Sequence, residues 1–136
     1  MKSVVERILP IPGFEGYYAS KKGKIYSTLS KGCRDRYNLE KRVPPKELKY
    51  RITKNGYARV YMRNNNYNRV DVYVHRIIGE LYVPNPNNLP EINHIDSVRL
   101  HNENTNLEWV TREENMNHAI KYGYMTRNEK GQFIHK

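Results

Sequence analysis

The stretches EINHID at residues 91–96 and NLEWVT at residues 106–111 decide the fold of this chain. Residues 91–95 and 107–111 are short apolar runs of a length typical of strands, and a polar loop, 96–105, separates them. A segment with helical character begins directly after the second run. The order strand, loop, strand, helix predicts a small ββα unit.

The helix that completes this unit is expected at residues 112–122. Thr111 suits its N-cap, and Glu114 stands three residues further on, which is a capping-box pattern. Gly123 is the expected C-cap, because glycine tolerates the left-handed backbone that ends many helices. The tail, 123–136, is polar, and we expect residues 126–136 to be mobile.

A second helix is expected at residues 75–82, where Ile77, Ile78 and Leu81 fall on one face. The proline-rich segment 84–90 ends this helix and forms a rigid connector to the ββα unit.

The clearest β pattern lies between residues 49 and 75. Asn55-Gly56 is a strong hairpin signal, and three asparagines at 64–66 supply a second turn. Side chains alternate along the strands, so one face is apolar and the other carries Arg and Tyr. The apolar positions are Ala58, Val60, Met62, Val70, Val72 and Val74.

The beginning of the chain is less regular. Residues 8–28 are interpreted as a two-stranded unit with glycine turns. Residues 30–47 are polar, contain Pro44-Pro45 and show no period, so a loop or linker is expected there.

The whole chain of 136 residues is therefore predicted to be α+β. Residues 1–74 would form an N-terminal antiparallel β-rich half, residues 75–122 the ββα unit with its leading helix, and residues 123–136 the tail. A mean hydropathy of −0.92 indicates a modest core.

Charge is divided unevenly along the chain, whose formal net charge is +10. Residues 1–76 carry 18 Lys and Arg against 6 Asp and Glu, a net charge of +12, whereas residues 77–122 carry 3 against 7, a net charge of −4. The basic half suits neutralisation of phosphates, and the acidic half suits a cation. The alternative is a basic protein with ordinary solvated faces.

Composition argues against a membrane-spanning protein, a secreted protein and a fold held by disulfides or a four-cysteine zinc site. No run is apolar and long enough to span a bilayer, and charges interrupt the short apolar run at the N-terminus, unlike in a signal peptide. The one cysteine, Cys33, cannot form an intramolecular disulfide or a four-cysteine zinc site. We therefore expect a cytoplasmic protein with no membrane partner.

These motifs resemble the HNH nuclease family in its ββα-metal (His-Me finger) form, especially the phage- and intron-encoded homing endonucleases. Residues 11–27 are similar to a DNA-binding segment often fused to such modules, and residues 74–86 to the helix and linker that lead into them. Residues 91–111 resemble the motif itself, and residues 115–119 resemble its metal helix. The resemblance covers most of residues 8–119 and implies a bacterial host of a phage or mobile element.

The resemblance implies a metal-dependent DNA endonuclease in which His94 is the general base and Asn106 orders the loop. An imidazole titrates near neutral pH, so a neutral fraction is available to accept a proton. Asn93 and Asn115 match the family's metal ligands and imply one Mg²⁺ or Mn²⁺ ion per site.

Two neutral ligands are a departure, since the family commonly has Asp or His before the base. Weak metal affinity without DNA is therefore expected. Asp96 could supply charge, although it equally suits an Asx-type turn, and His118 shares a helical face with Asn115.

Double-stranded DNA is the expected partner. A two-stranded ribbon fits the major groove, and Lys at a turn suits phosphates. The candidate DNA-binding residues are Lys21, Lys22, Lys24, Lys49, Arg51, Tyr57, Arg59, Tyr61, Arg63, Arg69 and Arg76. The alternative is an amphipathic sheet whose exposed polar residues have no special role.

We predict an endonuclease that acts as a monomer on DNA without a small-molecule cofactor, and one site per chain implies a nick. Two alternatives stay open. The protein could bind DNA on an inactive HNH scaffold, or it could bind RNA, because Tyr and Arg on a sheet can stack on unpaired bases.

Overall fold

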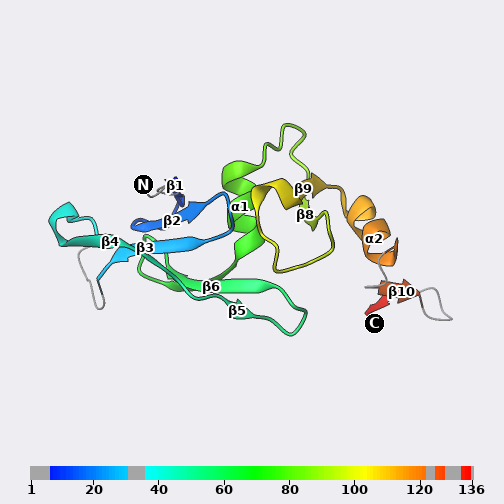
Figure 1. Cartoon of the computed structure of the whole chain (residues 1–136), viewed down its shortest axis with the longest axis horizontal. Coiled ribbons are helices and arrows are strands. Elements are labelled where there is room, and N and C mark those ends of the chain that lie inside the picture. Colours follow the sequence, from blue (N-terminus) through cyan, green and yellow to red (C-terminus); the bar gives the residue numbers. More distant parts are fainter. Residues whose placement is uncertain (1–6, 31–35, 122–124, 128–132, 136) are drawn as a thin grey trace, which may run out of the picture.

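The computed structural model describes residues 7–30, 36–121, 125–127 and 133–135 (Figure 1). Within these residues the chain forms small antiparallel sheets and two α-helices, which confirms the α+β class. No helix in the described part is long and apolar enough to cross a membrane.

The first sheet has four strands in the order β1-β2-β3-β4. Its strands are β1 (Ile8–Pro10), β2 (Tyr17–Ser20), β3 (Ile25–Leu29) and β4 (Arg42–Glu47), and a short 3-10 turn, Leu39–Lys41, precedes β4. Two predictions were wrong here, because residues 8–28 contain three strands and residues 30–47 include a strand. Pro44 and Pro45 are tolerated since β4 is an edge strand, where a missing N–H breaks no second ladder.

The second sheet contains β5 (Arg51–Ile52), β6 (Ala58–Arg63) and β7 (Arg69–Tyr73). The predicted alternation holds in β6, where Ala58, Val60 and Met62 are each only 1% exposed, but not in β7, where Val70, Asp71 and Val72 are all partly buried. The turns at Asn55-Gly56 and Asn64–Asn66 are also confirmed. Val74 differs from the prediction, since it is the first residue of a helix.

The remaining elements follow the predicted order. They are α1 (Val74–Tyr82), β8 (Glu91–His94), a 3-10 turn (Asn104–Asn106), β9 (Leu107–Val110) and α2 (Arg112–Lys121). The capping box of α2 has both of its hydrogen bonds, from Glu114 N to Thr111 Oγ1 and from Thr111 N to Glu114 Oε1, each 3.1 Å long. The predicted C-cap, Gly123, lies outside the described residues.

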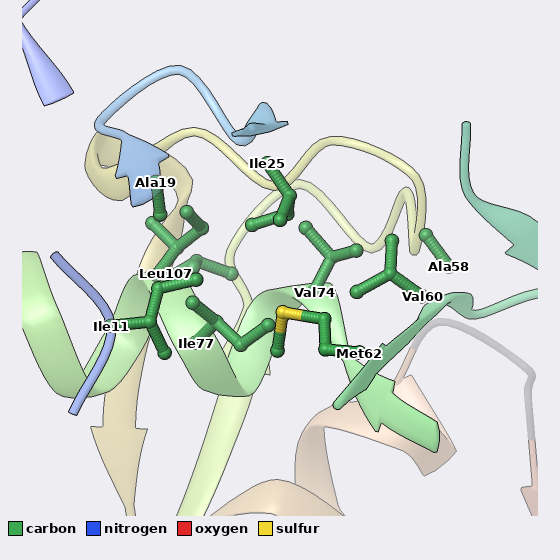
Figure 2. Close-up of a cluster of buried hydrophobic side chains, with 10 residues drawn as sticks. Ile11, Ala19, Ile25, Ala58, Val60, Met62, Val74, Ile77 and Leu107 are labelled. Atoms are coloured by element: carbon green, nitrogen blue, oxygen red, sulfur yellow. The ribbon is translucent and has the colours of Figure 1, made fainter. Parts of the chain in front are cut away.

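One hydrophobic core joins the two halves of the molecule. In Figure 2, Val74 and Ile77 of α1 meet Ile25 of β3, Met62 of β6 and Leu107 of β9. Figure 1 accordingly shows α1 between strands β1–β3 and the β8–β9 hairpin, with β5 and β6 below. The shared core fixes the position of the ββα unit relative to the basic sheets.

A buried arginine, Arg36, ties the first two sheets together. Its guanidinium donates to the carbonyl oxygens of Glu15 at 2.9 Å and Arg63 at 2.8 Å, and it also reaches Asn64 O. A buried charge needs such partners, because burial without them costs several kcal/mol. This role could not be predicted from the sequence, since Arg36 lies in a segment without periodicity.

The end of the chain contains two strands that the sequence did not predict. Strands β10 (Met125–Arg127) and β11 (Phe133–His135) pair antiparallel. Backbone hydrogen bonds can pair short strands whatever their side chains, so polar composition alone was a poor guide.

Candidate active site

A small pocket of about 40 Å³ lies where β8 meets α2. Polar residues that line it are Tyr57, Asn93, His94, Ser97, Arg99, Asn115 and His118. Asn93 and His94 are neighbours in sequence, yet both face the pocket, because β8 ends at His94 and the chain turns there. The structure thus brings together the proposed base and both proposed metal ligands.

His94 is buried, with 5% of its surface exposed, and its ring is held by one hydrogen bond. The ring Nε2 lies 2.8 Å from Oδ1 of Asn102. An amide oxygen can only accept a hydrogen bond, so Nε2 carries the proton of the neutral ring. The lone pair is then on Nδ1, which is the atom able to accept a proton.

Aromatic rings pack around His94. The ring centroid of His75 lies 5.1 Å away and that of Tyr57 lies 6.0 Å away. Burial lowers the pKa of His94 below its ordinary value, although the hydrogen bond with Asn102 and the charge of Asp96 act in the opposite direction. Burial, with smaller contributions from His94 and Arg76, lowers the pKa of His75 to about 3. Burial therefore favours the neutral form of both imidazoles.

The two candidate metal ligands are oriented by carboxylates. Asn93 Nδ2 donates to Glu108 Oε1 at 2.9 Å, and Asn115 Nδ2 donates to Glu91 Oε1 at 2.8 Å. With each amide nitrogen engaged, the amide oxygen is the atom available to a cation. Oxygen donors fit a hard ion such as Mg²⁺ or Mn²⁺, and the nearby carboxylates supply the negative charge that the amides lack. No group of three His, Cys, Asp or Glu side chains within the described residues could hold a metal.

Asp96 and Asn106 organise the loop that follows β8. Asp96 Oδ1 accepts from Val98 N at 2.8 Å and from Asn106 Nδ2 at 2.9 Å, and Oδ2 lies 2.6 Å from His101 Nδ1. Desolvation raises the pKa of Asp96, but the hydrogen bonds from His101, Val98 and Asn106 outweigh it and bring the pKa to about 2. These contacts favour the Asx-type turn for Asp96, which does not line the pocket.

Asn106 makes the loop-bridging contacts expected of it. Its Oδ1 accepts from Asp96 N at 3.0 Å, and its Nδ2 donates to His101 O at 2.8 Å. His118, the weaker ligand candidate, does line the pocket, and its Nε2 lies 3.3 Å from Ile95 O.

The Arg and Tyr side chains of the second sheet form a stacked array. Guanidinium groups of Arg51 and Arg69 lie 3.8 Å and 4.0 Å from the centroid of the Tyr61 ring. Asp71 forms ion pairs with Arg51, at 2.7 Å, and with Arg59. The contacts hold the arginines in fixed positions along the sheet.

The other DNA-binding candidates lie in separate places. Lys21, Lys22 and Lys24 are exposed at the β2–β3 turn, and Lys49 is exposed before β5. Arg63 Nη1 donates to Tyr67 O at 3.1 Å, and Arg76 of α1 is paired with Glu80 at 3.3 Å. Tyr57 differs from the expectation of an open sheet face, because it lies beside His94 with Arg99 4.8 Å above its ring.

Sequence reasoning missed Asn102, Arg99 and the packing of His75 against His94. All three depend on contacts between residues far apart in the chain or inside the polar loop, where no period exists. Asparagine is common in polar loops, so the residue type at position 102 did not indicate a contact with His94.

The fold and the pocket together define a ββα nuclease module joined to basic antiparallel sheets. Comparison with known families agrees: residues 6–63 match the NUMOD4 motif, and residues 72–117 match an HNH endonuclease. The chain carries an HNH endonuclease domain preceded by a NUMOD4 motif, so the predicted resemblance is confirmed. The predicted division at residue 74 stays a prediction.

Individual relatives support the same family. The chain is 35% identical over 113 residues to an uncharacterised HNH endonuclease of Acanthamoeba polyphaga mimivirus, over 83% of this chain and 30% of that protein. It is 27% identical over 123 residues to the DNA endonuclease I-HmuI of Bacillus phage SP01, over 90% of this chain and 62% of the phage protein. The chain thus spans less than two thirds of either relative.

A solved structure is also similar. The chain matches the structure described as DNA binding and cleavage by the HNH homing endonuclease I-HmuI with a TM-score of 0.65 and 28% identity. The match covers 86% of this chain and 59% of that one.

Proposed function

We propose that this protein is a metal-dependent DNA endonuclease in which His94 is the general base. The observation that carries the proposal is the pocket where the buried His94 ring lies beside two amides oriented by carboxylates. The phage relative adds support, because its solved structure is described as binding and cleaving DNA.

Hydrolysis would begin at His94. Its Nδ1 accepts a proton from water as the water oxygen attacks phosphorus. The bond between phosphorus and the 3′ oxygen then breaks, and the leaving oxygen takes a proton from solvent. The products are a 5′-phosphate end and a 3′-hydroxyl end. Nδ1 suits this role because Asn102 occupies Nε2.

The amide oxygens of Asn93 and Asn115 would hold one Mg²⁺ or Mn²⁺ ion, with substrate phosphate and water completing its ligands. Such an ion, when bound, neutralises charge that builds on the phosphate and the leaving oxygen. Glu91 and Glu108 keep the two amides oriented and add negative charge nearby.

Duplex DNA would bind the exposed Arg and Tyr face of the second sheet and the β2–β3 turn. The stacked Arg51, Tyr61 and Arg69 side chains offer fixed donors to base edges or phosphates, and the lysines of the β2–β3 turn offer mobile charges. Since the described residues form one site that contains a candidate base and metal ligands, a monomer would cleave one strand and leave a nick.

A second candidate is a DNA-binding protein that does not cleave. The observation that favours it is the pair of neutral Asn ligands, which bind a divalent ion less strongly than carboxylates. The third candidate function is binding to single-stranded RNA. Competition between duplex DNA and RNA distinguishes it from the two functions that act on DNA.

The decisive experiment is cleavage of a supercoiled plasmid in Mg²⁺, Mn²⁺ or EDTA by the wild type and by His94→Ala. We expect open circles that require metal and are absent with the variant. Linear product would indicate paired action on both strands. Tight, salt-sensitive binding without cleavage in any metal would exclude the endonuclease and leave the binding protein.

A further inference from the structure

Asn102 contacts His94 but does not line the pocket. It is 6% exposed and is absent from the pocket lining, whereas His94 is part of that lining. Asn102 instead borders a separate cavity of about 200 Å³, together with Lys22 and Gly23 of the β2–β3 turn. It therefore touches the base without facing the place where substrate would lie.

The contact with Asn102 decides which nitrogen of His94 is free. A neutral imidazole has one N–H, and the Asn102 amide oxygen 2.8 Å from Nε2 fixes that N–H there. In the other tautomer, Nε2 would present a lone pair to an oxygen acceptor, and Nδ1 would carry the hydrogen. A histidine in that tautomer has no lone pair on Nδ1 with which to accept a proton from water.

The β2–β3 turn holds the loop that carries Asn102. Asn104 N donates to Lys21 O at 2.7 Å, which joins the loop to the turn by a backbone bond. Gly23 lies directly against Asn102, because a Cβ atom added to Gly23 would stand 2.9 Å from Asn102 O and 3.0 Å from Asn102 Cβ. Neither Asn102 atom is the far end of a flexible side chain that could move away, so this contact leaves no room for a larger residue.

We propose that Asn102 is a positioning residue that keeps His94 in the Nε2–H tautomer, and that the β2–β3 turn at Gly23 fixes the position of Asn102. The catalytic consequence rests on the proposed endonuclease function. The turn that carries Lys21, Lys22 and Lys24 then has two tasks: it presents charge to DNA, and it supports the base of the active site.

The first test replaces the acceptor. Asn102→Leu has a similar size but cannot accept a hydrogen bond, whereas Asn102→Asp keeps an oxygen at the same place. Long-range ¹⁵N–¹H spectra of the metal-free protein, recorded where His94 is neutral, report its tautomer directly. We expect Nε2–H in the wild type and Asn102→Asp, and a mixture or Nδ1–H in Asn102→Leu.

Cleavage provides the second readout for the same variants. We expect kcat of Asn102→Leu to fall at least about tenfold with KM for DNA little changed, the size seen when a supporting partner is removed, and Asn102→Asp to recover most of it. An Nδ1–H tautomer in the wild type, or an unchanged kcat in Asn102→Leu, would overturn the proposal. If the wild type does not cleave at all, the proposed function fails while the tautomer still tests the positioning role.

The turn is tested with two matched glycines. Gly23 and Gly13 have similar positive φ angles, +89° and +82°, so Ala brings similar backbone strain to both. A Cβ at Gly13 meets nothing within 4 Å, whereas one at Gly23 meets Asn102. We expect Gly23→Ala alone to disturb the His94 tautomer and to lower kcat. Equal effects of both variants, or none, would rule out the contribution of the turn.

Discussion

At the scale of single residues, the candidate cation site combines neutral ligands with acidic neighbours. The side-chain amides of Asn93 and Asn115 each donate a hydrogen bond to a glutamate carboxylate. A cation bound to either amide oxygen would therefore be attracted by the negative charge of the glutamate behind it. Such partners orient a ligand and increase its donor strength. The arrangement gives a site with little charge facing the pocket itself, which suits an ion that arrives together with a DNA phosphate.

Asn93→Asp tests this arrangement. The new carboxylate loses the donor to Glu108 and places like charges together, so we expect the metal-free protein to lose about 1–3 kcal/mol of unfolding free energy. Mg²⁺ should recover stability in the variant more than in the wild type, because the site gains charge. Thermal melts across a metal titration measure both effects. Adding Glu108→Gln restores a donor and should remove the metal-free loss; if it does not, the bond to Glu108 has another role.

The lowered pKa of His75 predicts that the stability of the fold depends on pH. Burial among His94, Arg76, Tyr57 and Tyr73 lowers the pKa of His75 to about 3, and its Nδ1 has no hydrogen-bond partner within the described residues. The unfolded chain binds this proton below about pH 6.5. The free energy of unfolding should therefore be independent of this histidine above about pH 6.5 and should fall as the pH drops toward 3.

The expected slope is up to about 1.4 kcal/mol per pH unit for one such histidine. His75→Phe keeps the ring and removes the titrating group, so its stability should fall less steeply between pH 6.5 and 4. Urea unfolding at several pH values measures the difference. Parallel curves for the two proteins would show that His75 is not the titrating residue.

At the scale of elements, α2 carries Asn115 and His118 but buries no residue completely. A helix with so little packing depends on its ends, and the capping box between Thr111 and Glu114 supplies two hydrogen bonds there. The same cap therefore supports the position of a candidate metal ligand.

Thr111→Ala should cost about 1 kcal/mol of stability, whereas Thr111→Ser retains the hydroxyl and should cost much less. Because Asn115 lies in the first turns of α2, we also expect the alanine variant to bind Mn²⁺ more weakly. Chemical unfolding and a Mn²⁺ titration followed by electron paramagnetic resonance measure the two effects. Equal stability of the alanine and serine variants would show that the cap contributes little.

The elements also show which parts of the fold can be predicted from sequence. Local patterns were sufficient for β6, α1 and the start of α2, because period, hairpin turn and cap all agree there. Strand β4 was missed since its pairing with β3 is non-local and its prolines suggest a loop. Asn102 was missed for the same reason: its task depends on His94 and Gly23, which only the folded chain brings together.

At the scale of the whole molecule, α1 joins a basic half to an acidic half through one core. Residues 1–76 have a net charge of +12 and residues 77–122 a net charge of −4. The basic residues of the second sheet and the β2–β3 turn would bind the phosphate backbone, and the acidic half would leave the pocket able to attract a cation. The lysines of the β2–β3 turn lie next to the loop of the pocket, so they should contribute to binding close to the scissile bond.

The salt dependence of DNA binding tests that contribution. Lys21→Ala with Lys22→Ala removes two charges at the turn, and Lys41→Ala with Lys46→Ala removes two exposed charges near and on β4 as a control of equal net charge. Each phosphate contact contributes about 0.9 to the slope of log K against log salt, so the turn variant should lose about 1.8. The control should lose far less, because a change of net charge alone acts over long range and is screened by salt. Fluorescence anisotropy from 50 to 300 mM salt measures the slopes, and equal slopes for both variants would mean that the protein binds DNA through general charge without using the turn.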